Sequence, residues 1–434
     1  MNADVLAGDA GRGEGGGCSD AERPNEQRWP LRPRPFPDEL LSSWLIRLAA
    51  AHGLKLHTFC SLAWPGKQIW NRDIDKTADS AFLADLALRS GRTQAEVRAT
   101  CLGAYEGVAF ESGATNGKMR WVLPVGVYSR SRKRFGVQYC GRCLAQDAEP
   151  HFRRAWRLAF VTECVRHRVP LDDRCSACGA PVVFHRGDMG HKGKRVADPM
   201  SSCHSCGFDL RRGPSGQLSP VEQDPLLQLL SALEQGLLDR WIALPGHGPA
   251  PTHLYLTGLR QIMCLAVGKN FGPRIRAAAA ERYGVPDWDV SGDSHQAEFE
   301  YLRLEDRRRV LRLCAYLLND WPTGFVEICT ELKLWACDAL GNLSPAPFWY
   351  WSVVHDHLER SFYSPTVEEI AWCIAKNDEV FDGLYFPPHK RIRFIPIWNS
   401  AGISVSPHRD ALRRRAERGK HHQVGIVPSG GFFK

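Results

Sequence analysis

The chain has 434 residues, of which 44% are hydrophobic and 24% are charged, and this balance is that of a soluble globular protein. Its length exceeds that of one compact core of ordinary size, so two or three domains are expected. No run of about 18 apolar residues occurs, which argues against a membrane span and a membrane partner. No charged segment followed by an apolar one opens the chain, so we expect no secretory signal and a cytoplasmic protein.

The net charge of +8 is concentrated in one part of the sequence. The segment from Lys118 to Arg174 contains thirteen Lys and Arg residues against five Asp and Glu residues, so it holds the whole excess. A basic patch of this kind indicates a polyanion partner such as DNA. A solvated basic face without a partner is the alternative reading of the same composition.

The N-terminal part begins with a Gly-rich polar tail, residues 1–28, which we expect to be disordered because it contains little that could be buried. Closely spaced prolines in residues 29–37 predict an extended lead-in. A helix should follow, capped by Asp38 and ended by Gly53. Its buried stripe is predicted from the three- and four-residue spacing of Leu40, Leu41, Trp44, Leu45 and Leu48.

Residues 79–102 predict a helix-turn-helix shape. Thr93 and Glu96 form the pattern of a capping box at the start of the second helix. Arg92 and Arg98 add positive charge to this hairpin, so it is a candidate for reading DNA, although plain packing of two helices is the favoured interpretation of this element taken alone. The apolar residues that should bury the first helix are Phe82, Leu83, Leu86 and Leu88.

Two basic segments precede and follow the first cysteine pair. The first is a predicted loop that carries Arg130, Arg132, Lys133 and Arg134. The second is a predicted short helix that buries Phe152, Trp156 and Phe160 and presents Arg153, Arg154 and Arg157 on another face. We expect these arginines and this lysine to contact DNA phosphates, which gives position and affinity rather than base recognition.

Eight Cys and His residues lie in four pairs, and each pair has two residues between its members. This spacing predicts two tetrahedral zinc sites, whereas a disulfide framework is not expected in a reducing compartment. Sequential pairing of the four pairs is favoured, and an interleaved cross-brace stays open. The predicted ligands are Cys140, Cys143, Cys164 and His167 for one Zn²⁺, and Cys175, Cys178, Cys203 and Cys206 for the other.

The chemistry predicted for these sites is structural. Four protein ligands leave no open position for water, whereas a catalytic zinc keeps one. No His-Glu-x-x-His motif is present, and Gly193-Lys194 lacks the spacing of a phosphate-binding loop. We therefore assign no catalytic residue and do not expect an enzyme. The other cysteines, such as Cys60 and Cys314, are interpreted as core residues.

The C-terminal part is predicted to be helical, with helices at 226–238, 254–267, 307–318 and 367–374. Ser364 and Pro365 should open the last helix, and Pro322 should end the one before it. The fold class is therefore mainly α with small zinc-ribbon β elements. The predicted domains are a tail (1–28), an N-terminal helical domain (29–130), a double zinc module (131–211), a C-terminal helical domain (220–400) and a basic flexible tail (401–434).

Several of these motifs together resemble the TniQ/TnsD family of transposon target-selection proteins. The opening motif reads Phe36-Pro-Asp-Glu-Leu-Leu-Ser-Ser-Trp-Leu-Ile-Arg-Leu-Ala49. The zinc half of the resemblance lies in residues 138–145, 153–160, 164–167 and 171–179, and the whole covers roughly residues 29–211. One departure is that Gly141 and Ser176 stand where the family often has Pro.

The resemblance implies a function in transposition. Family members recognise a target site, directly on DNA or through a CRISPR guide-RNA complex, and recruit an AAA+ ATPase regulator that engages a separate transposase. It implies a bacterial, nucleoid-associated protein, and a homodimer stays open as its assembly. Two alternatives remain from the residues alone. One is a transcription regulator with a zinc ribbon and a helix-turn-helix; the other is a metal-dependent enzyme acting on nucleic acid.

Overall fold

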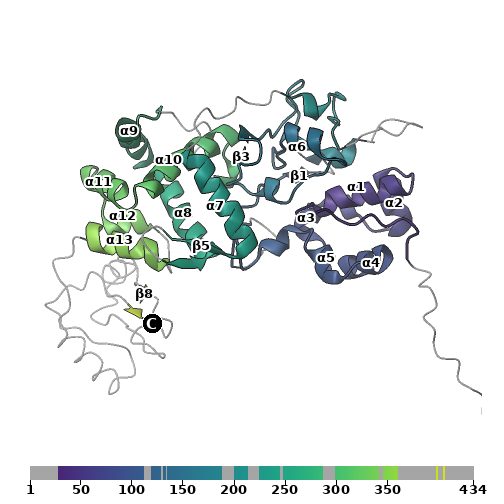
Figure 1. The fold of residues 1–434 in the computed structure, drawn as a ribbon, viewed down its shortest axis with the longest axis horizontal. Coiled ribbons are helices and arrows are strands. Elements are labelled where there is room, and N and C mark those ends of the chain that lie inside the picture. Colours follow the sequence, from purple (N-terminus) through teal and green to yellow (C-terminus); the bar gives the residue numbers. More distant parts are fainter. Residues whose placement is uncertain are drawn as a thin grey trace, which may run out of the picture.

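A computed structural model describes residues 28–111, 119–128, 131–132, 134–187, 200–213, 224–244, 248–286, 299–341, 346–359, 397–398 and 404–405. In these residues the fold is mainly α with small two-stranded antiparallel hairpins, as the sequence predicts. The N-terminal helices lie at one end of the molecule and the C-terminal helices at the other (Figure 1). The metal-ligand segment lies between them. No described helix is long and apolar enough to cross a membrane.

The N-terminal end is built from short helices that bury one common core. Their bounds are α1 (Leu41–Ala51), α2 (Leu56–Ala63), η1 (Ile69–Asn71), α3 (Ile74–Thr77), α4 (Ser80–Ser90), α5 (Gln94–Arg98) and η2 (Leu102–Tyr105). The predicted α1 stripe is fully buried. The capping box of Thr93 and Glu96 is present, and Gly91 ends α4 with φ +63°. Leu88 was expected in the core but is 39% exposed, because it lies on the outer face of α4.

Asp38 does not cap α1, so that prediction is wrong. The N-cap position is Leu40 and no side chain bonds there. Asp38 has φ +58°, which turns its carboxylate away from the helix. Its carboxylate instead accepts hydrogen bonds from the Ala155 amide at 3.2 Å and the Tyr105 hydroxyl at 3.1 Å, and it pairs with Arg154 at 3.2 Å. The residue therefore joins the lead-in to the metal-ligand segment.

The middle of the molecule has little regular structure. It contains β1 (Val127–Tyr128), β2 (Ser131–Arg132), α6 (Gly141–Gln146), η3 (Ala155–Arg157), β3 (Glu163–Cys164), β4 (Val169–Pro170), η4 (Phe184–Arg186) and η5 (Leu210–Arg212). The helix predicted around residues 152–160 is only the turn η3. Its aromatic side chains are nevertheless buried as expected, since Phe152 and Phe160 are both 0% exposed.

The C-terminal helices confirm three of the four that were predicted. The elements are α7 (Pro225–Asp239), β5 (Trp241–Ala243), β6 (Pro249–Pro251), α8 (Thr252–Val267), α9 (Gly272–Tyr283), η7 (Phe299–Tyr301), α10 (Leu304–Asn319), α11 (Thr323–Glu331), α12 (Ala336–Leu340), α13 (Phe348–Leu358), β7 (Ile397–Trp398) and β8 (Ser404–Val405). The predicted helix 367–374 and its Ser364 cap lie outside the described residues.

Helix α10 is fixed to the middle segment by buried polar contacts. Arg307, only 1% exposed, donates to the Ala159 carbonyl at 2.7 Å and to Gln138 Oε1 at 3.1 Å. Burial lowers the pKa of this guanidinium to about 10, and the nearby acidic groups offset only part of that effect. Arg308 pairs with the buried Glu163 at 2.5 Å. One continuous hydrophobic core runs through all three parts.

Glu234 of α7 predicts a pH dependence of stability. Burial, followed by repulsion from Asp38, raises its pKa from 4.5 to about 7. A raised carboxyl pKa gives stability that is full below the unfolded value of 4.5 and is lost as pH rises through 7. Glu234→Gln should therefore unfold at a higher temperature than the unmodified protein at about pH 8, and the gain should vanish below about pH 5.

Thermal unfolding followed by circular dichroism across this pH range measures the effect. Glu331 is exposed, so Glu331→Gln serves as the matched control and should leave the pH dependence of the unfolding temperature unchanged. Parallel profiles for the unmodified protein and Glu234→Gln would contradict the interpretation.

Candidate metal centres and basic residues

The first cluster combines residues from α6, β3 and the turn that follows β3. Cys143 Sγ lies 3.6 Å from Cys164 Sγ and 3.3 Å from His167 Nδ1. Cys140 Sγ and Cys164 Sγ each lie 3.5 Å from the same nitrogen. His167 Nε2 faces Gln146 Oε1 at 2.7 Å, so Nε2 carries the proton there and Nδ1 offers its lone pair to a metal.

The second cluster contains the other four of the eight predicted ligands, all of them cysteines. Cys175 Sγ lies 3.7 Å from Cys206 Sγ, and Cys178 Sγ lies 3.7 Å from Cys203 Sγ. In both clusters all four donor atoms lie within 4.8 Å of one another. The structure thus brings the eight residues together as two sequential sets, and it does not show the interleaved arrangement.

The donor sets fit a tetrahedral metal ion. A metal–sulfur bond of about 2.3 Å places tetrahedral ligand atoms about 3.8 Å apart, and the separations in both clusters are close to this value. Each cluster can therefore bind a metal ion with all four positions filled by protein.

The same backbone turn presents three of the four ligand pairs. The amide four residues after the first cysteine donates to that cysteine's carbonyl, from Arg168, Gly179 and Gly207 at 2.7–2.9 Å. All three donors have positive φ, from +52° to +74°. Glycine adopts this conformation without strain, which explains the Cys-x-x-Cys-Gly pattern in the second cluster.

The clusters differ in their burial. In the first cluster the three cysteines are buried and only His167 is partly accessible. In the second cluster Cys178 and Cys206 are exposed while the other two cysteines are buried. Solvent and chelators can therefore reach the second cluster more directly.

Other Cys and His residues stay outside the clusters. His185 is stacked on Trp70 with ring centroids 4.9 Å apart, so it packs the segment that carries the second cluster against the N-terminal helices. Cys60, Cys314 and Cys329 are buried as predicted. Burial raises the pKa of the Cys60 thiol to about 12, which makes it unreactive at neutral pH.

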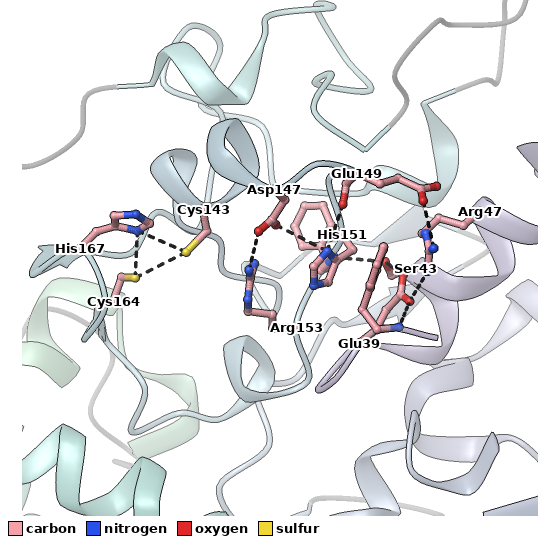
Figure 2. Close-up of polar contacts among 12 residues, drawn as sticks. Glu39, Ser43, Arg47, Cys143, Asp147, Glu149, His151, Arg153, Cys164 and His167 are labelled. Atoms are coloured by element: carbon pink, nitrogen blue, oxygen red, sulfur yellow. Dashed lines mark hydrogen bonds and ion pairs between the residues drawn. The ribbon is translucent and has the colours of Figure 1, made fainter. Parts of the chain in front are cut away.

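Residues 36–49, the first motif of the TniQ resemblance, form a set of polar contacts beside the first cluster (Figure 2). Glu39 accepts hydrogen bonds from Arg47 at 2.7 Å and from Ser43 at 2.8 Å. The Ser43 hydroxyl in turn accepts a bond from the Phe152 amide at 3.1 Å. Arg47 also pairs with Glu149 at 2.9 Å. These contacts attach α1 to the segment that carries the metal ligands.

Arg157 is not a phosphate-binding residue, so this prediction is wrong. Its side chain is 0% exposed and lies against Asp73 at 2.6 Å and Asp75 at 3.3 Å. Burial opposes its charge, but the two carboxylates outweigh burial and raise its pKa. Asp75 also accepts hydrogen bonds from the amide and hydroxyl of Ser42. The guanidinium therefore joins α3, α1 and η3 inside the protein.

Arg153 and Arg154 are also used internally. Arg153 pairs with Asp147 at 2.8 Å and lies 4.7 Å over the Trp156 ring, while Arg154 pairs with Asp38. Their side chains are only 20% and 16% exposed. The η3 turn therefore offers no row of free arginines to a phosphate backbone.

The remaining basic candidates have different surroundings. Arg98 is exposed on α5, and half-buried Arg92 donates to the Arg32 carbonyl at 3.3 Å. Arg134 is exposed and lies over a tyrosine ring. Arg132 is in β2, but its side chain is not described, and Arg130 and Lys133 lie outside the described residues.

Removal of the buried guanidinium should destabilise the fold. We expect Arg157→Ala to lower the free energy of unfolding by about 3–5 kcal/mol, because it removes the guanidinium partner of the fully buried Asp75 and the largely buried Asp73. The exposed Arg166→Ala, in the same basic segment, should change it by less than about 0.5 kcal/mol. Urea unfolding followed by tryptophan fluorescence measures both values, and an equal cost for the two variants would contradict a buried structural role.

Comparison with known families agrees with the resemblance drawn from the sequence. Residues 30–171 match the family model TniQ, and no curated protein matches the chain. The matched segment contains the opening motif, the buried ion pairs of Arg47 and Arg157, and the first metal-ligand cluster. Residues 30–171 thus form a segment that is similar to the TniQ family, and we call this segment the TniQ domain.

Proposed function

We propose that this protein is a non-catalytic adaptor that selects transposition targets, binding target DNA directly or through a guide-RNA complex. It recruits an AAA+ ATPase regulator, which engages the transposase. The observation that carries the proposal is the TniQ match, since this family acts in the selection of transposition targets. The fixed packing of the domain against the C-terminal helices supports a scaffold that holds partners in a set geometry.

The two clusters are proposed to hold structural Zn²⁺. Thiolate and imidazole donors at tetrahedral separations suit zinc. A bound ion would cross-link four side chains in each cluster, and the filled coordination supports a structural role. In the first cluster the protein orients His167 through Gln146, and in the second it relies on the glycine turns.

The α4–α5 hairpin is the proposed contact with duplex DNA. Its α5 helix has five residues, and only Val97 among them is buried. A helix this short suits phosphate contacts by Arg92 and Arg98 better than extended base reading. The segment of Arg130, Arg132, Lys133 and Arg134 is proposed to add further phosphate contacts, whereas Arg157 is no longer part of the surface.

Zinc content and release test the metal proposal. We expect about two equivalents of Zn²⁺ per chain, and chelator-induced release in two phases with the exposed cluster first. Cys206→Ser should remove the fast phase and leave the fold of the TniQ domain intact. Cys143→Ser should remove the slow phase and lower the unfolding temperature, because its cluster lies in the core. Folded protein without zinc, or a single phase in the unmodified protein, would overturn the proposal.

Two readouts test the adaptor proposal. Arg92→Ala/Arg98→Ala should weaken duplex binding and reduce the slope of log K against log salt by about 1.8, since each phosphate contact contributes about 0.9. Arg166→Ala is the control for loss of one exposed charge. Affinity capture of the tagged chain from its native host should bring down an AAA+ ATPase. Absence of both duplex binding and this partner would contradict the proposal.

A further inference from the structure

A groove of about 890 Å³ lies where the TniQ domain meets the C-terminal helices. It is bordered by α3 on one side and by α8 and η7 on the other, and we call it the α3–η7 groove. The segment between the two sides forms an apolar floor of Val122, Leu123, Pro124, Val125 and Val127. None of the eight metal ligands lines this groove.

The charges that line the α3–η7 groove leave it positive. Its carboxylates are both paired with an arginine, Asp73 with Arg157 at 2.6 Å and Glu300 with Arg260 at 2.5 Å. Arg72 and Arg120 are exposed on its rim, and neither forms an ion pair with a carboxylate in the described ranges. Lys76 also lines the groove and interacts with Asp73, so the net positive charge comes from Arg72 and Arg120. These cations favour an anionic occupant.

An aromatic ring stands at the η7 side of the groove. Tyr301 lines it and is 38% exposed. The Arg134 guanidinium lies 4.5 Å from the centroid of the tyrosine ring. A tyrosine beside an arginine offers a π surface together with a cation, and both groups stack on nucleobases.

We propose that the α3–η7 groove binds a segment of single-stranded nucleic acid, with phosphates at Arg72 and Arg120 and a base against Tyr301. This inference rests on the proposed action on nucleic acid and adds a second site to it. The apolar floor suits bases and sugars that are accessible only in a single strand, whereas a duplex hides its bases. A volume within the range of about 300–1,000 Å³ typical of ligand pockets suits a few nucleotides.

The experiment compares oligonucleotides by fluorescence anisotropy on the zinc-loaded full chain. The probes are single-stranded DNA and RNA of about 12 nucleotides, which lies within the site sizes of such grooves, and a longer DNA duplex. Arg72→Ala/Arg120→Ala should weaken single-strand binding by at least about tenfold. It should also reduce its salt slope by about 1.4, because each phosphate contributes about 0.7 in single strands.

The aromatic contact has its own variants. Tyr301→Ala should weaken single-strand binding by about tenfold, and Tyr301→Phe should retain it, because stacking needs the ring and not the hydroxyl. Arg92→Ala/Arg98→Ala serves as the crossed control, since it should impair duplex binding and spare the single strand. Circular dichroism on each variant checks that the fold is kept.

The outcomes separate this inference from the proposed function. Duplex binding without single-strand binding overturns the groove assignment alone, and so does single-strand binding that the groove variants leave unchanged. Absence of both kinds of binding, together with absence of the AAA+ partner, overturns the proposed function. Preference for DNA or RNA identifies the strand. Stronger binding of an acidic peptide than of either oligonucleotide overturns the assignment in favour of a protein partner.

Discussion

The buried contact of Arg157 with Asp73 and Asp75 determines how the parts of this protein fit together. A fully buried guanidinium is costly to desolvate, and its two carboxylates compensate that cost only in one geometry. The contact joins α3 to η3, and Asp75 extends it to Ser42 at the start of α1. The N-terminal helices therefore cannot move relative to the metal-ligand segment without exposing or separating buried charges, which favours a rigid TniQ domain.

The same ion pair shows why a count of charge along the sequence overestimates a basic surface. The segment from Lys118 to Arg174 holds the whole net charge, but two of its arginines pair with acidic residues from outside the segment. Asp38 lies far upstream and pairs with Arg154, while the Arg157 partners belong to α3. The positive charge that reaches the surface is therefore redistributed. Arg120 of this segment lines the same groove as Arg72 from outside it, and the sequence did not single out either residue because no local pattern marks them.

The predictable features are those set by local chain geometry. Two-residue spacing with a following glycine specified the metal-ligand turns, and long apolar periodicity specified α7, α8 and α10. The segment at 152–160 was assigned wrongly because its backbone groups are used across the fold. The Arg157 carbonyl accepts from Leu123, and the Ala159 amide donates to Trp121, so these groups cannot form helical bonds. Such long-range pairing leaves no signature in the spacing of apolar residues.

The two clusters have unequal consequences for the rest of the protein because of what adjoins their ligands. Cys164 follows Glu163, which binds Arg308 and Arg312 of α10. Cys140 lies two residues after Gln138, which binds Arg307. An ion in the first cluster would thus hold the backbone positions to which the C-terminal helices are attached.

The second cluster lies beside Phe184, which stacks on Phe152 with ring centroids 4.1 Å apart, and its outer cysteines face solvent. Its occupancy can change with less effect on the central packing, so the geometry of the described fold depends more on the first cluster.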